Sequence, residues 1–417
     1  MRCGGHVLWL AAAALSTVAA AQEECSPPPP CDTVACAAAR RAEGTRYRIP
    51  AAEPGAAVVE ATQERMDWES ALVFIHIFKA GGSTVKSVVS MAATLGGWYT
   101  SIAPSEMGWA SYSAEPRETA SMPRFIAGAY GMGHCELTER PCLYFTVLRD
   151  PFQRMVSEYD YFCVKGNEQR KEWNAEWKAQ GACGASLVEW ASRSYQRPRP
   201  DAGQRTWAGD GSNSSLPNHP NFLLDRLGGS DGVCALEDAK HNLAHPCLRY
   251  LLLPPSGKGR PAALNSTLEE QLTRLATELG GNANFTLRHA IEYEGHMTWR
   301  NVGTGKSART KQQLETPGVR ERLREILALD LELWDWAVEH NAEQWSVPLQ
   351  FCHQRPEYTG PGTLANFDFW GEWLGVLLAG TPLHITQPYT DLLFSSLPWA
   401  VRAHLPFLAP FMPRTKA

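Results

Sequence analysis

The sequence lacks three features that would each point to a common class of protein. It has no excess of basic residues, because its 417 residues include 39 lysines and arginines against 44 aspartates and glutamates. The resulting formal net charge of -5 gives no reason to expect nucleic-acid binding. No CxxC pair is accompanied by a second pair of cysteines or histidines, so a structural zinc site is not expected. The GxxxxGKS or GxxxxGKT phosphate-binding pattern of many ATPases is also absent.

A glycine-rich turn lies at residues 79–82, between a predicted strand and a predicted helix. Residues 71–77 are almost continuously apolar, which is typical of a strand buried on both faces of a parallel sheet. After the turn, valine and alanine recur at helical spacing, so we expect a helix from Ser83 to about Gly96. Glycines in such a turn let backbone N–H groups approach a phosphate, and the helix N-terminus and Lys79 add positive charge.

The order of residues in this turn argues against an ATPase. In the ATP-binding loop the lysine ends the glycine-rich stretch, whereas Lys79 precedes Gly81 and Gly82. A glycine turn of an ordinary α/β sheet remains the alternative if this segment is considered alone.

A second predicted strand, 143–148, also runs into a turn and a helix. It ends at Arg149, and Asp150 and Pro151 are a good helix N-cap and first helical residue. Ser157 lies off the apolar stripe of this helix. Arg149 and Ser157 could therefore bind one phosphate group together, through the guanidinium and the hydroxyl. The alternatives are a salt bridge for Arg149 and a solvated helix face for Ser157.

Several segments resemble motifs of the Golgi carbohydrate sulfotransferases, the group that contains the heparan sulfate 2-O- and 6-O-sulfotransferases. HIFKAGGST at 76–84 is similar to their HIPKTGGTT segment, and VLRDPFQRMVSEY at 147–159 is similar to LRDPxxRxxSEY. GMGHCEL at 131–137 resembles their GxH segment, and DLELWDWA at 330–337 resembles their DxxLYDYA stretch. The segment 301–309 looks like the basic loop before that last helix.

The resemblance implies how the donor PAPS (3'-phosphoadenosine 5'-phosphosulfate) is bound. In the family the first segment holds the 5'-phosphosulfate, the second holds the 3'-phosphate, and the histidine of the third is the catalytic base. His134 is the matching base, since an imidazole can take the proton of a sugar hydroxyl, and Lys79 would stabilise charge on the transferring group. Lys306 or Arg309 could close over the nucleotide, unless they belong to a solvated loop. The scheme requires no metal. The implied donor-binding residues are Lys79, Ala80, Gly81, Gly82, Ser83, Thr84, Arg149, Ser157, Lys306 and Arg309.

Two positions of the first segment depart from the family pattern. Ala80 stands where the family usually has threonine, and Phe78 stands where it often has proline. The missing hydroxyl removes a possible phosphate contact worth about 1 to 3 kcal/mol. We therefore expect weaker donor binding, but not its loss.

For the fold, the resemblance implies an α/β, P-loop-like sulfotransferase fold of three layers, in which helices flank a central parallel sheet. For the function, it implies an enzyme, a PAPS-dependent sulfotransferase acting on a hydroxyl of a glycan or proteoglycan in the Golgi lumen. Two alternatives stay open. One is a catalytically inactive glycan-binding protein of the same fold, to which Ala80 points. The other is a nucleotide kinase, against which the position of Lys79 counts.

The chain is predicted to have four parts. Residues 1–21 form a targeting segment, either a signal peptide, which the short apolar run favours, or an uncleaved signal-anchor, which the resemblance favours. The protein would be secreted or luminal in the first case and a single-pass type II Golgi membrane protein in the second. Residues 22–66 form a proline- and alanine-rich flexible stem, 67–347 the sulfotransferase domain, and 348–417 an extension of unknown role. The polar segment 166–217 is expected to recognise the acceptor.

Cysteines and glycosylation sequons agree with exposure to an oxidising compartment. Of the 11 cysteines, Cys3 lies in the targeting segment and the others are even in number, which is compatible with disulfides. Sequons for N-glycosylation begin at Asn213, Asn265 and Asn284.

Overall fold

The computed structural model describes most of the predicted domain. The described residues are 25, 46–49, 70–95, 99–107, 124–129, 132, 133, 135, 141–164, 186–192, 221–229, 233–253, 266–296 and 307–352. All of them belong to the first of the two compact units into which the chain divides, 1–358; the second unit, 359–417, lies outside the described residues.

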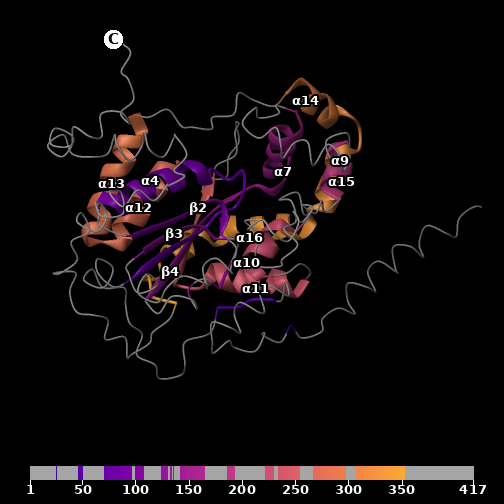
Figure 1. Cartoon of the computed structure of the whole chain (residues 1–417). Coiled ribbons are helices and arrows are strands. Elements are labelled where there is room, and N and C mark those ends of the chain that lie inside the picture. Colours follow the sequence, from indigo (N-terminus) through magenta and orange to yellow (C-terminus); the bar gives the residue numbers. More distant parts are fainter. Residues whose placement is uncertain are drawn as a thin grey trace, which may run out of the picture. The chain divides into compact units, whose positions relative to one another are not determined.

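A sheet of five parallel strands forms the centre of the fold (Figure 1). The strands stand in the order β2-β3-β1-β4-β5. Their bounds are β1 Ala71–Ile75, β2 Tyr99–Met107, β3 Arg124–Ala129, β4 Cys142–Arg149 and β5 Leu248–Leu253. The strands β1 and β4 correspond to the two strands predicted from the apolar runs, although β1 ends before His76 and Ile77.

Helices cover both faces of the sheet and enclose the core (Figure 1). One layer holds α4 (Gly82–Leu95), α12 (Leu268–Leu279) and α13 (Gly281–His296). The other holds α10 (Phe222–Gly228), α11 (Val233–Ala244) and α16 (Ala328–Gln344). All residues of β1 are buried, and in β4 only Arg149 is partly exposed. Burial on both faces explains why these strands are continuous apolar runs in the sequence. The predicted three-layer α/β fold is confirmed.

The order of the strands places a topological switch point between the central strands β1 and β4, at their carboxyl ends. From β1 the chain passes through α4 to β2, on one side of β1, and after β3 it crosses to β4 and β5 on the other side. The connections that follow β1 and β4 therefore diverge at the carboxyl ends of these two neighbouring strands. Open α/β sheets bind their ligands at such a point.

Helix α7 (Pro151–Tyr159) begins where β4 ends, as the sequence predicts. The Asp150 side chain accepts a hydrogen bond from the backbone N–H of Gln153 at 2.7 Å, and Pro151 is the first helical residue. A cap of this kind satisfies one of the free N–H groups of the first turn. The helix continues into one π-helical turn, η2 (Asp160–Val164).

A second apolar cluster joins α7 to three short helices. These are α9 (Leu187–Ser192), α14 (Ala308–Glu315) and α15 (Val319–Ile326). Trp190 of α9 is completely buried and packs edge-on against Tyr159, with ring centroids 6.0 Å apart. Helix α9 lies within the segment 166–217 that the sequence assigns to acceptor recognition. This part of the segment packs into the core, and acceptor recognition by the segment stays a prediction.

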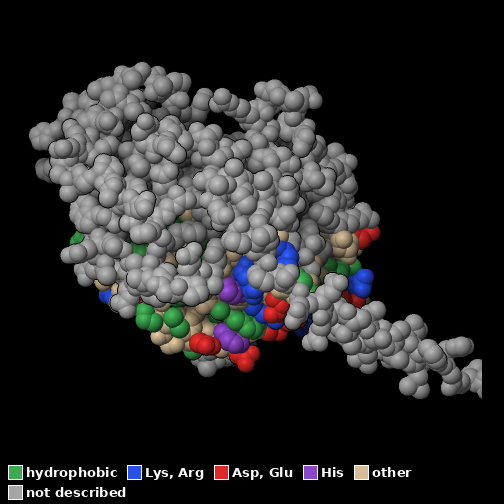
Figure 2. Space-filling view, turned by 90° about the horizontal axis from the view of Figure 1, so that it is seen from below, with side chains coloured by type: hydrophobic (Ala, Val, Ile, Leu, Met, Phe, Trp, Pro, Cys, Tyr) green, Lys and Arg blue, Asp and Glu red, His purple; other side chains and the backbone are tan. Residues whose placement is uncertain are grey.

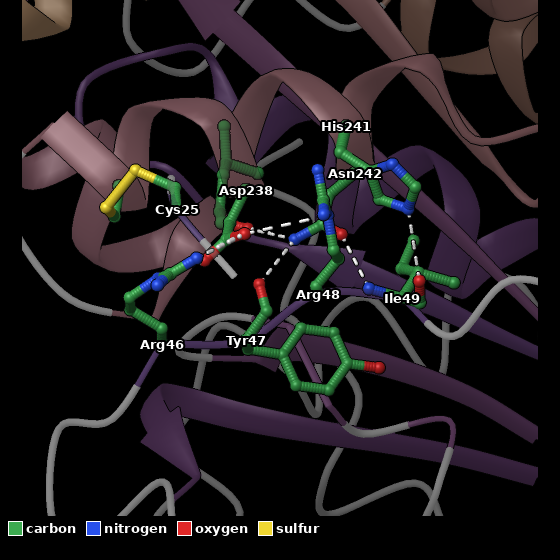
Figure 3. A network of polar contacts seen from close by, with 10 residues as sticks. Cys25, Arg46, Tyr47, Arg48, Ile49, Asp238, His241 and Asn242 are labelled. Carbon is green, nitrogen blue, oxygen red and sulfur yellow. Dashed lines mark hydrogen bonds and ion pairs between the residues drawn. A yellow bond between two sulfur atoms is a disulfide. The ribbon is translucent and has the colours of Figure 1, made fainter. Parts of the chain in front are cut away.

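A disulfide ties the start of the predicted stem to α11 (Figure 3). Cys25 is bonded to Cys234, which lies 209 residues later in the chain. Two further disulfides, Cys135–Cys142 and Cys247–Cys352, connect described residues, and Cys163 is also disulfide-bonded. The prediction of disulfides is confirmed. Over the described ranges, no helix has both the length and the apolar character required to cross a membrane.

Residues 46–49 of the predicted stem also bind α11 (Figure 3). Arg46 donates two hydrogen bonds to the Asp238 carboxylate, at 2.6 and 3.0 Å. The buried Ile49 donates its backbone N–H to the Asn242 side chain at 2.7 Å. Figure 2 shows basic, acidic and histidine side chains next to one another on the described part of one face. The described residues of the stem are therefore attached to the domain.

Candidate active site

The two predicted phosphate turns meet at the carboxyl ends of β1 and β4. Arg149, the last residue of β4, donates a hydrogen bond from Nη1 to the backbone carbonyl of Lys79 at 2.8 Å. Within the sheet, the hydroxyl of Thr146 donates to the carbonyl of Ile75 at 2.8 Å. Residues 79–82 and Arg149 therefore form one region, although 70 positions separate Lys79 from Arg149 in the sequence.

Left-handed backbone shapes the first turn. Lys79 has a φ of 63° and Gly81 a φ of 82°. Among the described residues, Lys79 is the one non-glycine residue with a positive φ, a conformation that costs energy and is common at functional sites. The Gly81 carbonyl then accepts hydrogen bonds from the N–H groups of Thr84 and Val85, at 3.1 and 3.3 Å. The N-terminus of α4, a favourable place for an anion, thus follows the turn directly.

The side chains at the start of α4 and in the turn differ in exposure. Ser83 is exposed and Thr84 is half-buried. Ala80 is completely buried. A threonine at this position would have to fit its extra atoms into filled space, so the departure from the family pattern concerns packing as well as hydrogen bonding.

Gly82 is required because the ring of His76 occupies the space beside it. A Cβ atom at Gly82 would overlap the Cδ2 and Nε2 atoms of His76. The imidazole is itself stacked between Phe74 and Phe78, with ring centroids 5.8 and 5.1 Å away. His76 therefore packs against Gly82, the first residue of α4. The sequence did not single out this residue, because a histidine that ends a strand has no distinctive pattern.

The environment of His76 keeps its imidazole neutral. Burial lowers its pKa well below the ordinary value, and the positive charges of Lys86, Arg226 and Lys79 lower the pKa further. The Nδ1 atom is buried and has no hydrogen-bond partner. A proton on this ring would add a buried positive charge close to three others.

Acidification should destabilise the folded protein through His76. The unfolded chain gains this proton near pH 6.5 and the folded state resists it, so this contribution to stability is complete above pH 6.5 and falls as the pH drops below it. Between pH 7.5 and 5.5 the loss should be about 1 kcal/mol, and His76→Gln should be spared it. Urea unfolding at the two pH values measures the difference. The same pH dependence in both proteins would contradict the assignment.

The side chain of Lys79 extends toward the end of α7. Its ammonium group lies 3.7 Å from the centroid of the Tyr161 ring in η2, a favourable cation–π distance. Lys79 therefore approaches the second motif twice, through its carbonyl at Arg149 and through its ammonium group at Tyr161.

Arg149 and Ser157 have the positions expected from the sequence, one at the end of β4 and the other two turns into α7. Burial lowers the pKa of the Arg149 guanidinium, and the neighbouring Asp150 carboxylate partly offsets this effect. Ser157 is half-buried. Its backbone carbonyl accepts a hydrogen bond from the N–H of Asp160 at the end of the helix.

Helix α7 also carries a completely buried ion pair. Nη1 of Arg154 lies 2.7 Å from Oε2 of Glu158, and neither side chain is exposed. The guanidinium also stands 4.5 Å from the centroid of the Phe222 ring in α10. Burial raises the pKa of Glu158 to about 7, against the effect of Arg154, which lowers it. The spacing of four residues is visible in the sequence, but such pairs are usually on helix surfaces, so their burial could not be foreseen.

The basic segment before the last helices is attached to the second motif. Asp160 accepts hydrogen bonds from the N–H of Ser307 at 3.1 Å and from the hydroxyl of Thr310 at 2.8 Å, so η2 holds the start of α14. Arg309 is exposed in this first turn, with Cζ 6.0 Å from the ring centroid of Tyr159. Arg309 is thereby brought to the end of α7; whether it closes over the donor, as the resemblance implies, stays a prediction.

Some predicted residues lie outside the described part of the chain. These are His134, Lys306, Asn213 and Asn265. The third sequon residue, Asn284, is half-buried in α13, and its side-chain oxygen accepts a hydrogen bond from Nε of Arg288 at 2.7 Å. Glycosylation at the three sequons stays a prediction.

Comparison with known families agrees with this geometry. Residues 63–337 match the model of a family described as the sulfotransferase family. The match includes both turns, the segment 131–137 and the first part of α16. A search of curated proteins finds no match to the chain.

Proposed function

The chain belongs to the sulfotransferase family, and from this membership we propose that it transfers the sulfuryl group of PAPS to a hydroxyl of a glycan or proteoglycan in the Golgi lumen. The observation that carries the proposal is the hydrogen bond from Arg149 to the carbonyl of Lys79. It places a guanidinium beside a turn with left-handed backbone and a helix N-terminus. Two anionic groups of one nucleotide could be held by such an arrangement.

The residues of the first turn fit the 5'-phosphosulfate. The amides at the start of α4 and the ammonium group of Lys79 provide positive charge where negative charge develops on the leaving phosphate. In this scheme the acceptor oxygen forms a bond to sulfur while the bond from sulfur to the bridging phosphate oxygen breaks. His134 takes the proton of the acceptor hydroxyl, which makes the hydroxyl oxygen a stronger nucleophile as it bonds to sulfur.

The residues of the second motif fit the 3'-phosphate. Arg149 offers a guanidinium fork and Ser157 a hydroxyl, and both are partly exposed. Arg309 lies beside Tyr159 at the C-terminal end of α7, the end that carries Ser157, and would add a further cation near the nucleotide. Binding of the 3'-phosphate separates PAPS from ordinary adenine nucleotides. No metal takes part in this scheme.

The direct test supplies the purified full chain with labelled PAPS and a panel of glycans, with mass spectrometry to locate the sulfate. Transfer to a glycan hydroxyl is the expected result. Sulfation of tyrosine peptides but of no glycan would overturn the substrate class. Binding of adenosine 3',5'-bisphosphate without any transfer would favour an inactive glycan-binding protein, and phosphate transfer from ATP would favour a kinase.

Replacing Arg149 with alanine should weaken donor binding selectively. The affinity for adenosine 3',5'-bisphosphate should fall about 10- to 100-fold, because a charge-assisted hydrogen bond to phosphate is lost. The affinity for 5'-AMP should fall less, since only the support of the Lys79 carbonyl is removed. Isothermal titration of both nucleotides measures the two losses. Equal losses would exclude a role for Arg149 at the 3'-phosphate.

The compartment is a separate part of the proposal. The disulfides of the described residues favour an oxidising compartment, because disulfides form and persist there. We place the chain in the Golgi lumen, held there as a type II membrane protein if residues 1–21 stay attached and soluble if they are removed.

A further inference from the structure

The hydroxyl of Tyr144 accepts two hydrogen bonds from one short loop. The backbone N–H of Gly133 donates to it at 2.9 Å, and the N–H of Cys135 donates at 2.7 Å. Tyr144 belongs to β4 and is almost completely buried. A phenolic oxygen has the lone pairs to accept both bonds. The two donors are the residues joined by peptide bonds to His134.

The same loop has two further attachments to rigid elements. The N–H of Met132 donates to the carbonyl of Arg226 in α10 at 3.1 Å. Cys135 forms a disulfide with Cys142, the first residue of β4. Gly133 has a φ of 102°, in the region that favours glycine. The loop therefore depends on β4 on one side and α10 on the other.

We propose that Tyr144 is a positioning residue that fixes the backbone on both sides of His134. This assignment rests on the proposed function, in which His134 is the base. Consecutive Cα atoms are about 3.8 Å apart, so a residue whose two neighbours are held can move only over a short distance. A base has to lie within hydrogen-bond reach of the proton it removes, and a small displacement lowers the rate strongly. Tyr144 supplies this precision without touching the substrate.

Tyr250 provides a matched control. It is buried in the neighbouring strand β5, and its hydroxyl donates to the carbonyl of Ala337 in α16 at 2.9 Å. Tyr144→Phe and Tyr250→Phe each delete one buried phenolic hydroxyl from adjacent strands. Of these two hydroxyls, that of Tyr144 is bonded to Gly133 and Cys135, whereas that of Tyr250 is bonded to α16. A purely structural effect would change the two variants in the same way.

The experiment compares the full chain, both variants and His134→Ala for transfer from PAPS to the best acceptor of the panel. Tyr144→Phe should lower kcat about 10- to 100-fold, with KM for PAPS and binding of adenosine 3',5'-bisphosphate unchanged. Tyr250→Phe should keep kcat within about twofold of the wild type, because surrounding packing is retained. Thermal unfolding of each variant shows whether it is folded.

A second alteration serves if Tyr144→Phe does not fold. The double variant Cys135→Ser and Cys142→Ser removes a different attachment of the same loop and should produce the same fall in kcat at constant KM. Equal kcat in Tyr144→Phe, or in this double variant, and the wild type would overturn the assignment while leaving the proposed function in place. An inactive wild type would overturn the proposed function, and the assignment with it. Full activity of His134→Ala would remove the base whose position Tyr144 is proposed to fix.

Discussion

Replacing His134 with alanine should lower the turnover of sulfuryl transfer by about 10²- to 10⁴-fold, which is the usual contribution of a general base. The reason is that a sugar hydroxyl is a poor nucleophile until its proton is removed. The affinity for adenosine 3',5'-bisphosphate should not change, because the groups assigned to the donor, among them Lys79, Arg149 and Ser157, do not include His134. Steady-state turnover and nucleotide titration on the same preparation separate the two effects.

Two controls make this result specific. His340 lies on α16 with its ring stacked on Trp336 and takes no part in the proposed chemistry, so His340→Ala should keep its turnover. Added imidazole should restore part of the activity of His134→Ala if a missing base is the only defect. A fully active His134→Ala would show that the base is another residue. A variant that loses nucleotide binding along with turnover would contradict a role confined to proton transfer.

Breaking the Arg154–Glu158 pair should have the largest effect on stability. Arg154→Met leaves the buried Glu158 carboxylate without its partner, and removal of one member of a buried pair typically costs about 3 to 5 kcal/mol. Methionine keeps most of the length and apolar stem of the arginine, so little of the loss comes from a cavity. Urea unfolding at pH 7.5 measures the change in the free energy of unfolding.

The double variant decides whether charge is the cause. Replacing Glu158 with methionine as well removes the uncompensated carboxylate, and the protein should recover most of the lost stability. Lower pH should also help Arg154→Met, because the pKa of Glu158 is already raised to about 7 by burial and protonation removes the charge. If the double variant is as unstable as the sum of the single variants, the packing of Arg154 on Phe222 matters more than the ion pair.

Local features of the site were predictable because they depend on neighbours in the sequence. The apolar runs gave β1 and β4, and the order Asp150, Pro151 gave the start of α7. The meeting of the two turns was also predictable, since the carboxyl ends of parallel strands lie at one edge of a sheet. The family resemblance then supplied the chemistry, which no spacing of residues could supply alone.

Features that depend on distant packing were not predictable. The contact of His76 with Gly82 requires the imidazole to pack against the first residue of α4, and no pattern in the sequence indicates such a contact. Trp190 lies in a polar segment that reads as a surface loop, yet α9 is part of the core because it packs against Tyr159. Tyr144 reads as one more apolar residue of a buried strand. Its hydroxyl gains significance only from the loop that approaches it.

The disulfide between Cys25 and Cys234 changes the reach of the catalytic domain from a membrane. A stem of residues 22–66 extended to its limit would span about 150 Å. Because residue 25 is bonded to α11, only the residues between 21 and 25 can separate this surface from an anchored targeting segment, a distance of at most about 14 Å. Membrane attachment would then hold the α11 face next to the lipid and restrict the enzyme to acceptors that pass close to the bilayer. Reduction of this one bond would lengthen the tether only as far as Arg46, which still binds Asp238 of α11.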